Sequence, residues 1–337
     1  MKRVRIGVLG AGAWGRNHVR TVAGMAEAEL VAIGDADAGV REKLARQYPA
    51  TLVTGSVEEV LRTVDAVIVA TPARTHAALA LQALQAGVPT LVEKPFALSV
   101  PDAVRMAEAA ARGSVPLLVG HLLEYHPVVE RLRTMIVEKT LGDLFYLYSQ
   151  RVNLGQVRPD ENALWSFGPH DISVALFLLG EAPVSVSAQG HSYLQQGIED
   201  IVFLHMNFRS GVMAHVQMSW LDPHKERRLT VVGSKQMAVF DDMAGREKLR
   251  IYDKGVDRPP EYRSYGESLS IREGDIFIPR LPNTEPLAAE LQHFVRVIRG
   301  EEPPRADAAD GVRSVRVLAA ATRSLQQGGM PIQVEDV

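Results

Sequence analysis

Short apolar runs alternate with helix-like patterns through the first 120 residues of the chain. Helix patterns appear at Val57–Leu61, Thr75–Ala86 and Pro101–Ala111. The apolar runs are nearly free of polar residues, which is typical of strands buried on both faces. These runs lie at Ile6–Leu9, Leu30–Ile33, Ala66–Ala70, Leu91–Val92 and Pro116–Val119. Because strands that alternate with helices form βαβ units, an α/β domain with a doubly wound parallel sheet is predicted for residues 1–120.

Residues 121–337 follow a different pattern, with long strands and few helices between them. Within Val212–Trp220 apolar and polar residues alternate, so one face of this strand is expected to be buried. Further strands are expected at Asp143–Asn153, Val184–Gln189, Asp200–Phe208, Arg227–Val232, Ala238–Asp241 and Leu249–Tyr252, and helices at Pro127–Glu138, Pro169–Gly180, Pro286–Arg299 and Ala308–Gln326. Strands with short connections pair antiparallel, so an α+β domain with a mostly antiparallel open sheet is predicted.

A segment rich in proline and arginine, at about residues 256–286, interrupts this second domain. Leu269–Ile271 and Ile276–Ile278 flank Glu273-Gly274-Asp275, which predicts a protruding hairpin. A solvated or subunit-contacting arm is favoured. The alternative is a diphosphate clamp, because guanidinium groups match phosphate oxygens. The arginines concerned are Arg258, Arg263, Arg272 and Arg280.

Composition removes several classes of function. The 337 residues carry a formal net charge of -3, which gives no electrostatic case for nucleic acid or an anionic membrane surface. The chain has no cysteine, which excludes disulfides and thiolate–metal sites, and it has no H-E-x-x-H spacing, so no metal is expected. No apolar run approaches a membrane span, and the N-terminal run is too short for a signal peptide. We therefore expect a soluble, cytoplasmic protein.

A glycine-rich turn follows the first expected strand and opens a helix. Its G-x-G-x-x-G spacing in that position is typical of a dinucleotide-binding Rossmann domain, in which glycines let the backbone approach a pyrophosphate. Asp35 ends the second strand and is expected to bind the adenosine ribose hydroxyls. Neither Ala36 nor Asp37 could meet a 2′-phosphate, so NAD is expected in preference to NADP. The turn supplies the expected cofactor contacts Gly10, Gly12, Ala13, Trp14 and Gly15.

Two later strand ends add residues to the same predicted site. Thr71 and Pro72 end the strand after Ala66 and would border the nicotinamide ribose. His76, one turn into the next helix, is interpreted as a surface or capping histidine or as a cofactor contact. Glu93-Lys94-Pro95 ends the strand after Thr90, and ligands of such sheets bind beyond the carboxyl ends of the strands.

Lys94 is the first candidate for acid–base chemistry. The positive charge of an oxidised nicotinamide ring would disfavour its ammonium form and lower its pKa. Glu93 could pair with it, and Pro95 restricts the backbone that follows. The alternative is a solvated loop lysine.

The segment from Leu164 to Asp171 holds the second candidate, His170. Gly168-Pro169 predicts a turn, which would place His170 in the first turn of a helix that ends at Gly180. A helix N-terminus favours the neutral imidazole, which can accept a proton. The alternative role for His170 is capping, and Asp171 is expected to be a structural partner.

These motifs together resemble the Gfo/Idh/MocA family, named after glucose–fructose oxidoreductase, inositol dehydrogenase and a rhizopine-catabolism protein. The resemblance rests on the Gly10–Gly15 turn, Ala70-Thr71-Pro72 with His76, Glu93-Lys94-Pro95 and the second-domain histidine. It implies NAD(P) binding and hydride transfer to or from a sugar or polyol carbon. It implies catalytic roles for Lys94 and His170, cofactor contacts that include Glu93 and Lys94, and substrate contacts from Lys94, His121, Tyr125, Trp165, Ser166 and His170.

The chain departs from this family at Ser166, where an acidic residue usually stands four positions before the histidine. A serine carries no charge at neutral pH, so the usual lysine–acid–histidine arrangement is incomplete. Either Asp171 or a water compensates, or the chemistry depends on Lys94 and His170 alone.

Within the family, three motifs resemble the branch of UDP-N-acetylglucosamine 3-dehydrogenases. They are Gly168–Ser173, Ile198-Glu199-Asp200 and Ser219–Pro223. They imply oxidation at C3 of a UDP-linked amino sugar. The alternatives are an inositol or free-sugar dehydrogenase and, in another class, a ligand-sensing regulator without turnover. Relatives commonly form dimers or tetramers, and the mixed strand face at His205, Asn207, His215 and Gln217 predicts association through the second-domain sheet.

Overall fold

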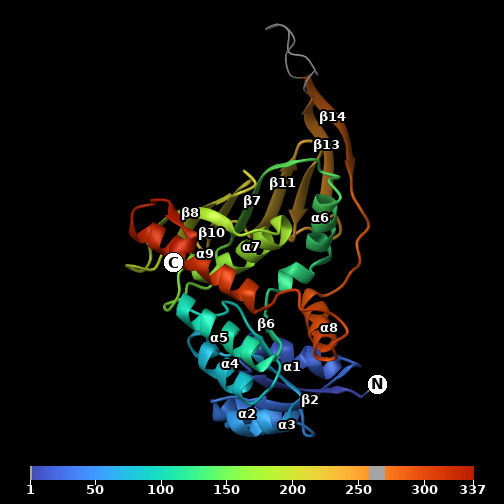
Figure 1. Cartoon of the computed structure of the whole chain (residues 1–337), viewed down its shortest axis with the longest axis vertical. Helices are drawn as coiled ribbons and strands as arrows, with labels where there is room; N and C mark the ends of the chain where they lie inside the picture. Colours follow the sequence, from blue (N-terminus) through green and yellow to red (C-terminus); the bar gives the residue numbers. More distant parts are fainter. Residues whose placement is uncertain (1, 258–269) are drawn as a thin grey trace. The chain divides into compact units, whose positions relative to one another are not determined.

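The computed structural model describes residues 2–257 and 270–337, which form two compact units (Figure 1). Unit 1 consists of Met1–Tyr125 and Thr284–Arg316, and unit 2 consists of His126–Asn283 and Val317–Val337. The first boundary lies close to the expected one near residue 120. The second differs from the expectation, because the chain returns to unit 1 near its end.

Unit 1 contains a six-stranded parallel sheet with strand order β3-β2-β1-β4-β5-β6. The strands are β1 (Val4–Leu9), β2 (Ala28–Gly34), β3 (Leu52–Thr54), β4 (Ala66–Val69), β5 (Thr90–Val92) and β6 (Leu117–Val119). The predicted doubly wound sheet is confirmed, with β3 in addition. All six strands are parallel, so their carboxyl ends lie at the same edge of the sheet. At that edge the ends of β1, β4 and β5 are neighbours, next to the point where the strand order reverses.

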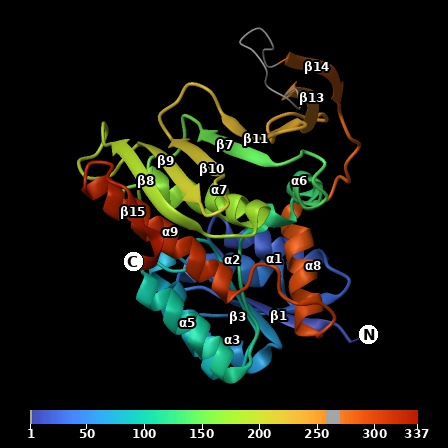
Figure 2. The same cartoon turned by 45° about the horizontal axis from the view of Figure 1, so that its top comes forward.

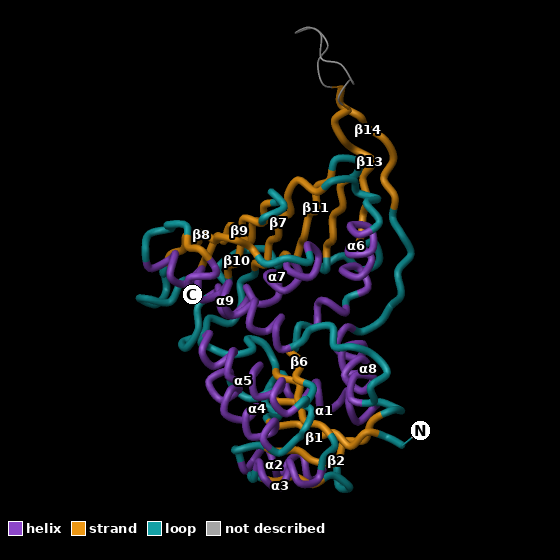
Figure 3. The backbone as a smooth tube through the Cα atoms, in the orientation of Figure 1, coloured by secondary structure: helices purple, strands orange, loops and turns teal. Residues whose placement is uncertain are grey.

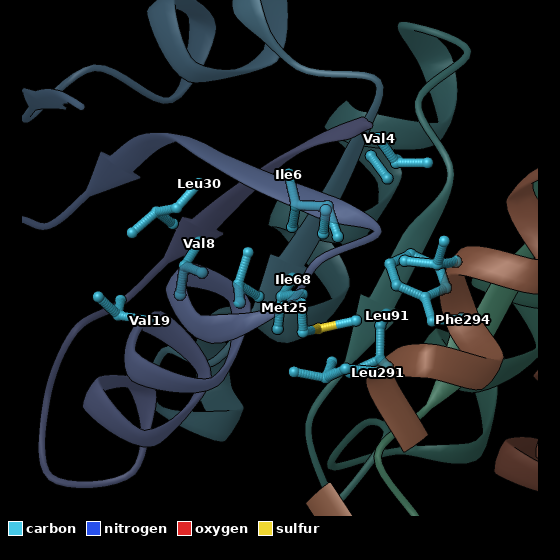
Figure 4. Close-up of a cluster of buried hydrophobic side chains, with 14 of the residues drawn as sticks. Val4, Ile6, Val8, Val19, Met25, Leu30, Ile68, Leu91, Leu291 and Phe294 are labelled. Carbon is cyan, nitrogen blue, oxygen red and sulfur yellow. The ribbon is translucent and has the colours of Figure 1, made fainter. Parts of the chain in front are cut away.

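Helices cover both faces of this sheet. They are α1 (Gly15–Gly24), α2 (Ala38–Gln47), α3 (Val57–Thr63), α4 (His76–Gln85), α5 (Val100–Gly113) and α8 (Pro286–Ile298), with short 3-10 turns η1 (Ala73–Thr75) and η2 (Leu122–Tyr125). The Ser99 hydroxyl accepts the Asp102 N–H at 3.2 Å and caps α5. On one face, Leu291 and Phe294 of α8 join Ile68 and Leu91 in a single apolar core, which explains the return of the chain to unit 1 (Figure 4).

Unit 2 contains a nine-stranded sheet with strand order β14-β13-β12-β11-β7-β10-β9-β8-β15. Its strands are β7 (Leu144–Val152), β8 (Pro183–His191), β9 (Ile201–Phe208), β10 (Met213–Ser219), β11 (Glu226–Gly233), β12 (Met237–Asp241), β13 (Leu249–Asp257), β14 (Ser270–Phe277) and β15 (Ile332–Gln333). All neighbours pair antiparallel except β7 and β10, so the predicted mostly antiparallel sheet is confirmed.

One face of the unit 2 sheet is apolar and packs against helix α7 (Ala163–Leu179), as Figure 2 shows. Val216 and Met218 of β10 are fully buried on this face, next to Trp220. The other face has exposed side chains, including Phe203 and Met213. Two further helices complete the fold, α6 (Pro127–Val137) and α9 (Ala308–Gln326), and a last 3-10 turn, η3, covers Val334–Asp336.

Two sequence-based expectations for unit 2 are wrong. Helix α7 begins at Ala163 and not near Pro169, because the Asn162 side chain caps it by accepting the Trp165 N–H at 3.0 Å. The expected turn at Glu273-Gly274-Asp275 is part of the continuous strand β14, which pairs with β13 (Figure 3). Of the four arginines expected in this arm, Arg258 and Arg263 lie outside the described residues, as does Leu269.

Candidate active site

The glycine turn between β1 and α1 has a backbone that only glycine allows at two positions. Gly10 has φ +86°, and a Cβ there would lie 2.7 Å from the backbone oxygen of Ala70. A Cβ on Gly15 would lie 1.9 Å from the Gly10 oxygen. At Gly12, in contrast, a Cβ would meet no described atom within 4 Å. Gly10 and Gly15 are therefore required by the fold, whereas Gly12 leaves its surroundings open to a ligand.

The N-terminus of α1 is suited to an anion. Trp14 precedes the helix, and within the described chain no side chain caps its first turn. The first N–H groups of a helix lack intrahelical partners and carry partial positive charge, which is the arrangement that binds phosphate.

Asp35 is fixed beside this turn. Its Oδ2 accepts the Ala11 N–H at 2.7 Å, and its Oδ1 accepts the Asp37 N–H at 2.9 Å. Each carboxylate oxygen keeps a lone pair that could accept a ribose hydroxyl. The Arg41 guanidinium also reaches this strand end, because its Nη1 donates to the Asp35 and Ala36 carbonyl oxygens, both at 2.8 Å. Sequence reasoning considered only adjacent residues and missed Arg41.

Glu93 joins three parts of unit 1 through one buried carboxylate. Its Oε1 accepts the Trp14 indole N–H at 2.5 Å and lies 2.7 Å from His18 Nε2, while its Oε2 accepts the Lys94 N–H at 3.0 Å. Burial alone would raise its pKa, but the hydrogen bond and charge of His18, together with the indole, outweigh burial and lower the pKa of Glu93. Gly120 leaves room for this carboxylate, since a Cβ there would lie 3.2 Å from Glu93 Cδ.

His18 was not expected as a site residue, although a signal for it exists in the sequence. It follows Trp14 by four positions, and residues four apart lie on the same side of a helix. The two rings meet edge to face, with centroids 6.3 Å apart. The structure thus shows that Trp14, His18 and Glu93 form one group.

Lys94 follows this group directly at the end of β5 and is half-buried. His76 stabilises the loops on either side, because its ring nitrogens lie 2.8 Å from the Thr71 oxygen and 2.9 Å from the Pro95 oxygen. The expectation of a surface histidine is wrong, since His76 is buried, and burial lowers its pKa against the opposing effect of these two carbonyls. Thr71 is held further by the Thr75 hydroxyl, at 2.7 Å.

His121 and Tyr125, both expected to contact substrate, are each only 3% exposed within unit 1. His121 Nδ1 lies 3.3 Å from Glu124 Oε1, and Arg305 lies over the Tyr125 ring at 4.7 Å. Their role as substrate contacts stays a prediction.

In unit 2, helix α7 carries Trp165, Ser166 and His170. His170 lies two turns after the start at Ala163, so the expected effect of the helix N-terminus on this imidazole is wrong, because that effect falls off within the first turn. Ser166 is buried and stands one turn before His170, on the same side of the helix. The Trp165 indole donates to the Thr322 hydroxyl at 3.0 Å.

Asp171 is a structural partner, as predicted. Its carboxylate forms a buried ion pair with Arg151 of β7, with Nε and Oδ2 2.5 Å apart. A carboxylate bound in this way is fixed to the sheet and has a structural role. Asp171 therefore does not replace the acidic residue that the family usually has at the position of Ser166.

The motifs around Asp200 and Trp220 organise the start of α7. Asp200 is fully buried and accepts the Trp220 indole N–H and the Tyr193 N–H, both at 2.6 Å. Burial would raise its pKa, but the Leu194 N–H at 2.9 Å, the indole and the Tyr193 N–H together outweigh burial and lower the pKa of Asp200. Glu199 accepts from the Asn162 side chain at 2.6 Å and so orients the residue that caps α7.

The described part of the chain contains neither a metal-binding cluster nor a membrane-spanning helix. Residues 2–257 and 270–337 contain no cluster of three or more acidic or histidine side chains that could hold a metal ion. The same residues include no helix of sufficient length and apolarity to cross a membrane.

Comparison with known proteins identifies the family. Residues 4–121 match the oxidoreductase family with an NAD-binding Rossmann fold, and residues 129–239 match the Gfo/Idh/MocA C-terminal domain. The chain belongs to the Gfo/Idh/MocA oxidoreductase family.

Two kinds of curated relative match nearly the whole chain. A UDP-N-acetylglucosamine 3-dehydrogenase of Acidithiobacillus ferrooxidans is 30% identical, covering 95% of this chain and 96% of the relative. An inositol 2-dehydrogenase of Rhizobium meliloti is 27% identical, covering 96% and 97%. The solved structure of the Acidithiobacillus ferrooxidans enzyme GnnA superposes with a TM-score of 0.82 at 27% identity, over 97% of this chain and 99% of that one.

Proposed function

We propose that this protein is an NAD-dependent dehydrogenase that oxidises a hydroxyl group of a nucleotide-linked sugar, at C3 of a UDP-linked amino sugar. The observation that carries the proposal is the arrangement of the β5 end, where one buried carboxylate binds the glycine-turn tryptophan and the Lys94 backbone together. It ties a proton-transfer residue to the loop that would hold the cofactor.

The residues of unit 1 fit NAD. Gly12 leaves open space, no described side chain caps the start of α1 where the pyrophosphate would lie, and Asp35 is fixed with lone pairs for the adenosine ribose. Bound NAD would supply a hydride acceptor for the sugar C–H. Thr71, Pro72 and His76 would border the nicotinamide ribose.

Lys94 is the proposed base. As the sugar carbon becomes a carbonyl, its hydroxyl proton passes to the neutral amine of Lys94, so the two electrons leave with the hydride and the proton stays on the protein. His170 is the proposed second catalytic residue and would relay this proton. Ser166 occupies the position of the family's acid, and Asp171 is already bound to Arg151. Lys94 therefore carries more of the chemistry than it would beside an acid.

The nucleotide-sugar assignment is supported by the similarity to the UDP-N-acetylglucosamine 3-dehydrogenase over nearly the whole chain. The branch motifs that contain Glu199 and Asp200 also shape the start of α7, which carries Trp165, Ser166 and His170. An inositol dehydrogenase is the second candidate, favoured by relatives at 27% identity.

Two measurements test this proposal. Thermal stability with NAD present is compared on addition of UDP, UDP-N-acetylglucosamine, inositols and free sugars; a shift with inositols or free sugars alone would contradict the nucleotide-sugar assignment. NADH formation is then followed on the same compounds for wild type, Lys94→Ala and the exposed control Lys43→Ala. We expect turnover in wild type and the control and its loss in Lys94→Ala. Wild type no faster than Lys94→Ala on every compound would instead favour a ligand-sensing regulator.

Association through the exposed face of the unit 2 sheet is also proposed. Phe203, His205 and Met213 are exposed there, and exposed apolar side chains on such a mixed face favour a homodimer or homotetramer. Light scattering of wild type and Phe203→Glu would test it, and an unchanged mass in the variant would argue against this face.

A further inference from the structure

Glu290 of α8 is a fully buried carboxyl group in the apolar core of unit 1. Its neighbours along the helix, Leu287, Leu291 and Phe294, belong to the core that packs under the parallel sheet. A glutamate is among the residues least often buried in this way, because its ionised form is strongly solvated by water.

Neither carboxyl oxygen of Glu290 has a hydrogen-bond partner among the residues that the structure describes. An ionised carboxylate without a donor or a cation is far more costly to bury than a neutral carboxyl group. The geometry alone therefore favours the protonated form.

The charged groups around Glu290 point to the same form. Glu93 directly follows β5, and η2, which packs against α8, carries Glu124 and Tyr125. Burial is the largest effect, and with the charges of Glu93 and Glu124 it raises the pKa of Glu290 well above its usual value. Two basic side chains of unit 1 have partners other than Glu290, since His18 Nε2 lies 2.7 Å from Glu93 and Arg305 donates to the Glu124 backbone oxygen at 3.0 Å.

Helix α1 contributes two further buried polar atoms without a partner in the described structure, His18 Nδ1 and Thr21 Oγ1, and η2 contributes the Tyr125 hydroxyl. Helix α8 packs against both of these elements. The interior behind Glu93 thus contains several polar atoms without partners among the described residues, and there the Glu93 carboxylate accepts the Trp14 indole N–H and lies 2.7 Å from His18 Nε2.

We propose that Glu290 is a positioning residue, held as a neutral acid so that it adds no negative charge beside Glu93 behind the cofactor loop. A second negative charge there would repel Glu93 and compete for His18. Glu93 would then hold the Trp14 indole and the Lys94 backbone less firmly. The inference rests on the proposed role of this loop in binding the dinucleotide, and it makes binding of the dinucleotide sensitive to ionisation of Glu290.

The test compares wild type with Glu290→Gln, which is neutral at every pH, and with the control Glu285→Gln at the start of the same helix. Glu285 is exposed, directly precedes the first residue of α8 and forms a surface ion pair with Arg20 at 3.3 Å. Melting temperature and NADH affinity are measured from about pH 5 to about pH 9. Neither measurement needs sugar turnover. If the protein oxidised none of the tested sugars, the proposed function would be contradicted, but the role of Glu290 could still be tested.

The sign of the expected change follows from the raised pKa. The contribution of Glu290 to stability is fully present below the pKa of an unfolded glutamate, about 4.3, and is lost as pH rises through the higher folded pKa. Wild type should thus lose melting temperature relative to Glu290→Gln as pH rises. Its NADH dissociation constant should increase by roughly fivefold, which corresponds to about 1 kcal/mol, and Glu290→Gln should abolish that increase.

Glu285→Gln should follow wild type at every pH. Glu290→Leu, which is also uncharged, serves as the second variant if Glu290→Gln does not fold. Neutral variants whose melting temperature and NADH affinity keep the pH dependence of wild type would overturn the proposal.

Discussion

Replacing Glu93 by glutamine tests the group that ties Lys94 to the glycine turn. Glu93→Gln keeps the size of the side chain and removes its charge. The carboxylate is 4% exposed and accepts from the Trp14 indole, the His18 ring and the Lys94 backbone. Glutamine turns one acceptor oxygen into a donor, so one of these donors must lose its partner.

The magnitude follows from these contacts. Leaving a buried donor without its acceptor costs about 1–3 kcal/mol, and because the lost acceptor is a carboxylate the change should lie near the upper limit, about 3 kcal/mol. For a unit of this size each 1 kcal/mol shifts the melting temperature by about 2–4 °C. We therefore expect a fall of roughly 6–12 °C by calorimetry at neutral pH, with weaker NADH binding in a fluorescence titration.

The pH dependence adds a second constraint on the same variant. Because the folded pKa of Glu93 is lowered, its stabilisation is present above the unfolded pKa and is lost as pH falls through the folded pKa. The difference between wild type and Glu93→Gln should shrink on acidification below about pH 4.3. A variant that melts within about 1 °C of wild type at neutral pH and binds NADH equally well would refute the reasoning.

Three further predictions follow from single contacts. Gly10→Ala should lower stability by more than about 2 kcal/mol because its Cβ would meet backbone at 2.7 Å, whereas Gly12→Ala should melt like wild type and bind NADH more weakly; equal melting of the two would contradict this contrast. Asp35→Ser should move the ratio of activities toward NADP, since it removes a carboxylate beside Arg41; an unchanged ratio would count against Asp35 as the ribose ligand. Asp200→Asn should lower the melting temperature most at neutral pH and least in acid, because its pKa is lowered by its indole and backbone donors; a deficit independent of pH would exclude that explanation.

The sequence was sufficient where a local signal controls the structure. The glycine turn and the alternation in β10 depend on residues close together in the chain. Strand β3 was missed because it has only three residues, none of them fully buried, so it lacks the apolar run of a central strand.

Long-range contacts account for most of what could not be predicted. The start of α7 depends on Asn162, which is oriented by Glu199 from 37 positions away. The Trp14–Glu93 contact spans 79 positions, and periodicity carries no information on such pairs. Gly168-Pro169 led to the wrong prediction of a turn and a helix start near Pro169. Proline within a helix removes one backbone hydrogen bond, but it does not end this helix.

The return of the chain to unit 1 at Thr284–Arg316 has a consequence for biosynthesis. During synthesis the first 125 residues leave the ribosome with the face around Ile68 and Leu91 uncovered, and its covering helix α8 is made only after most of unit 2. The nascent protein therefore exposes part of an apolar surface until α8 has been made, and a fragment that ends at residue 125 should aggregate. Linking residues 284–316 to that fragment should restore a soluble, NADH-binding unit.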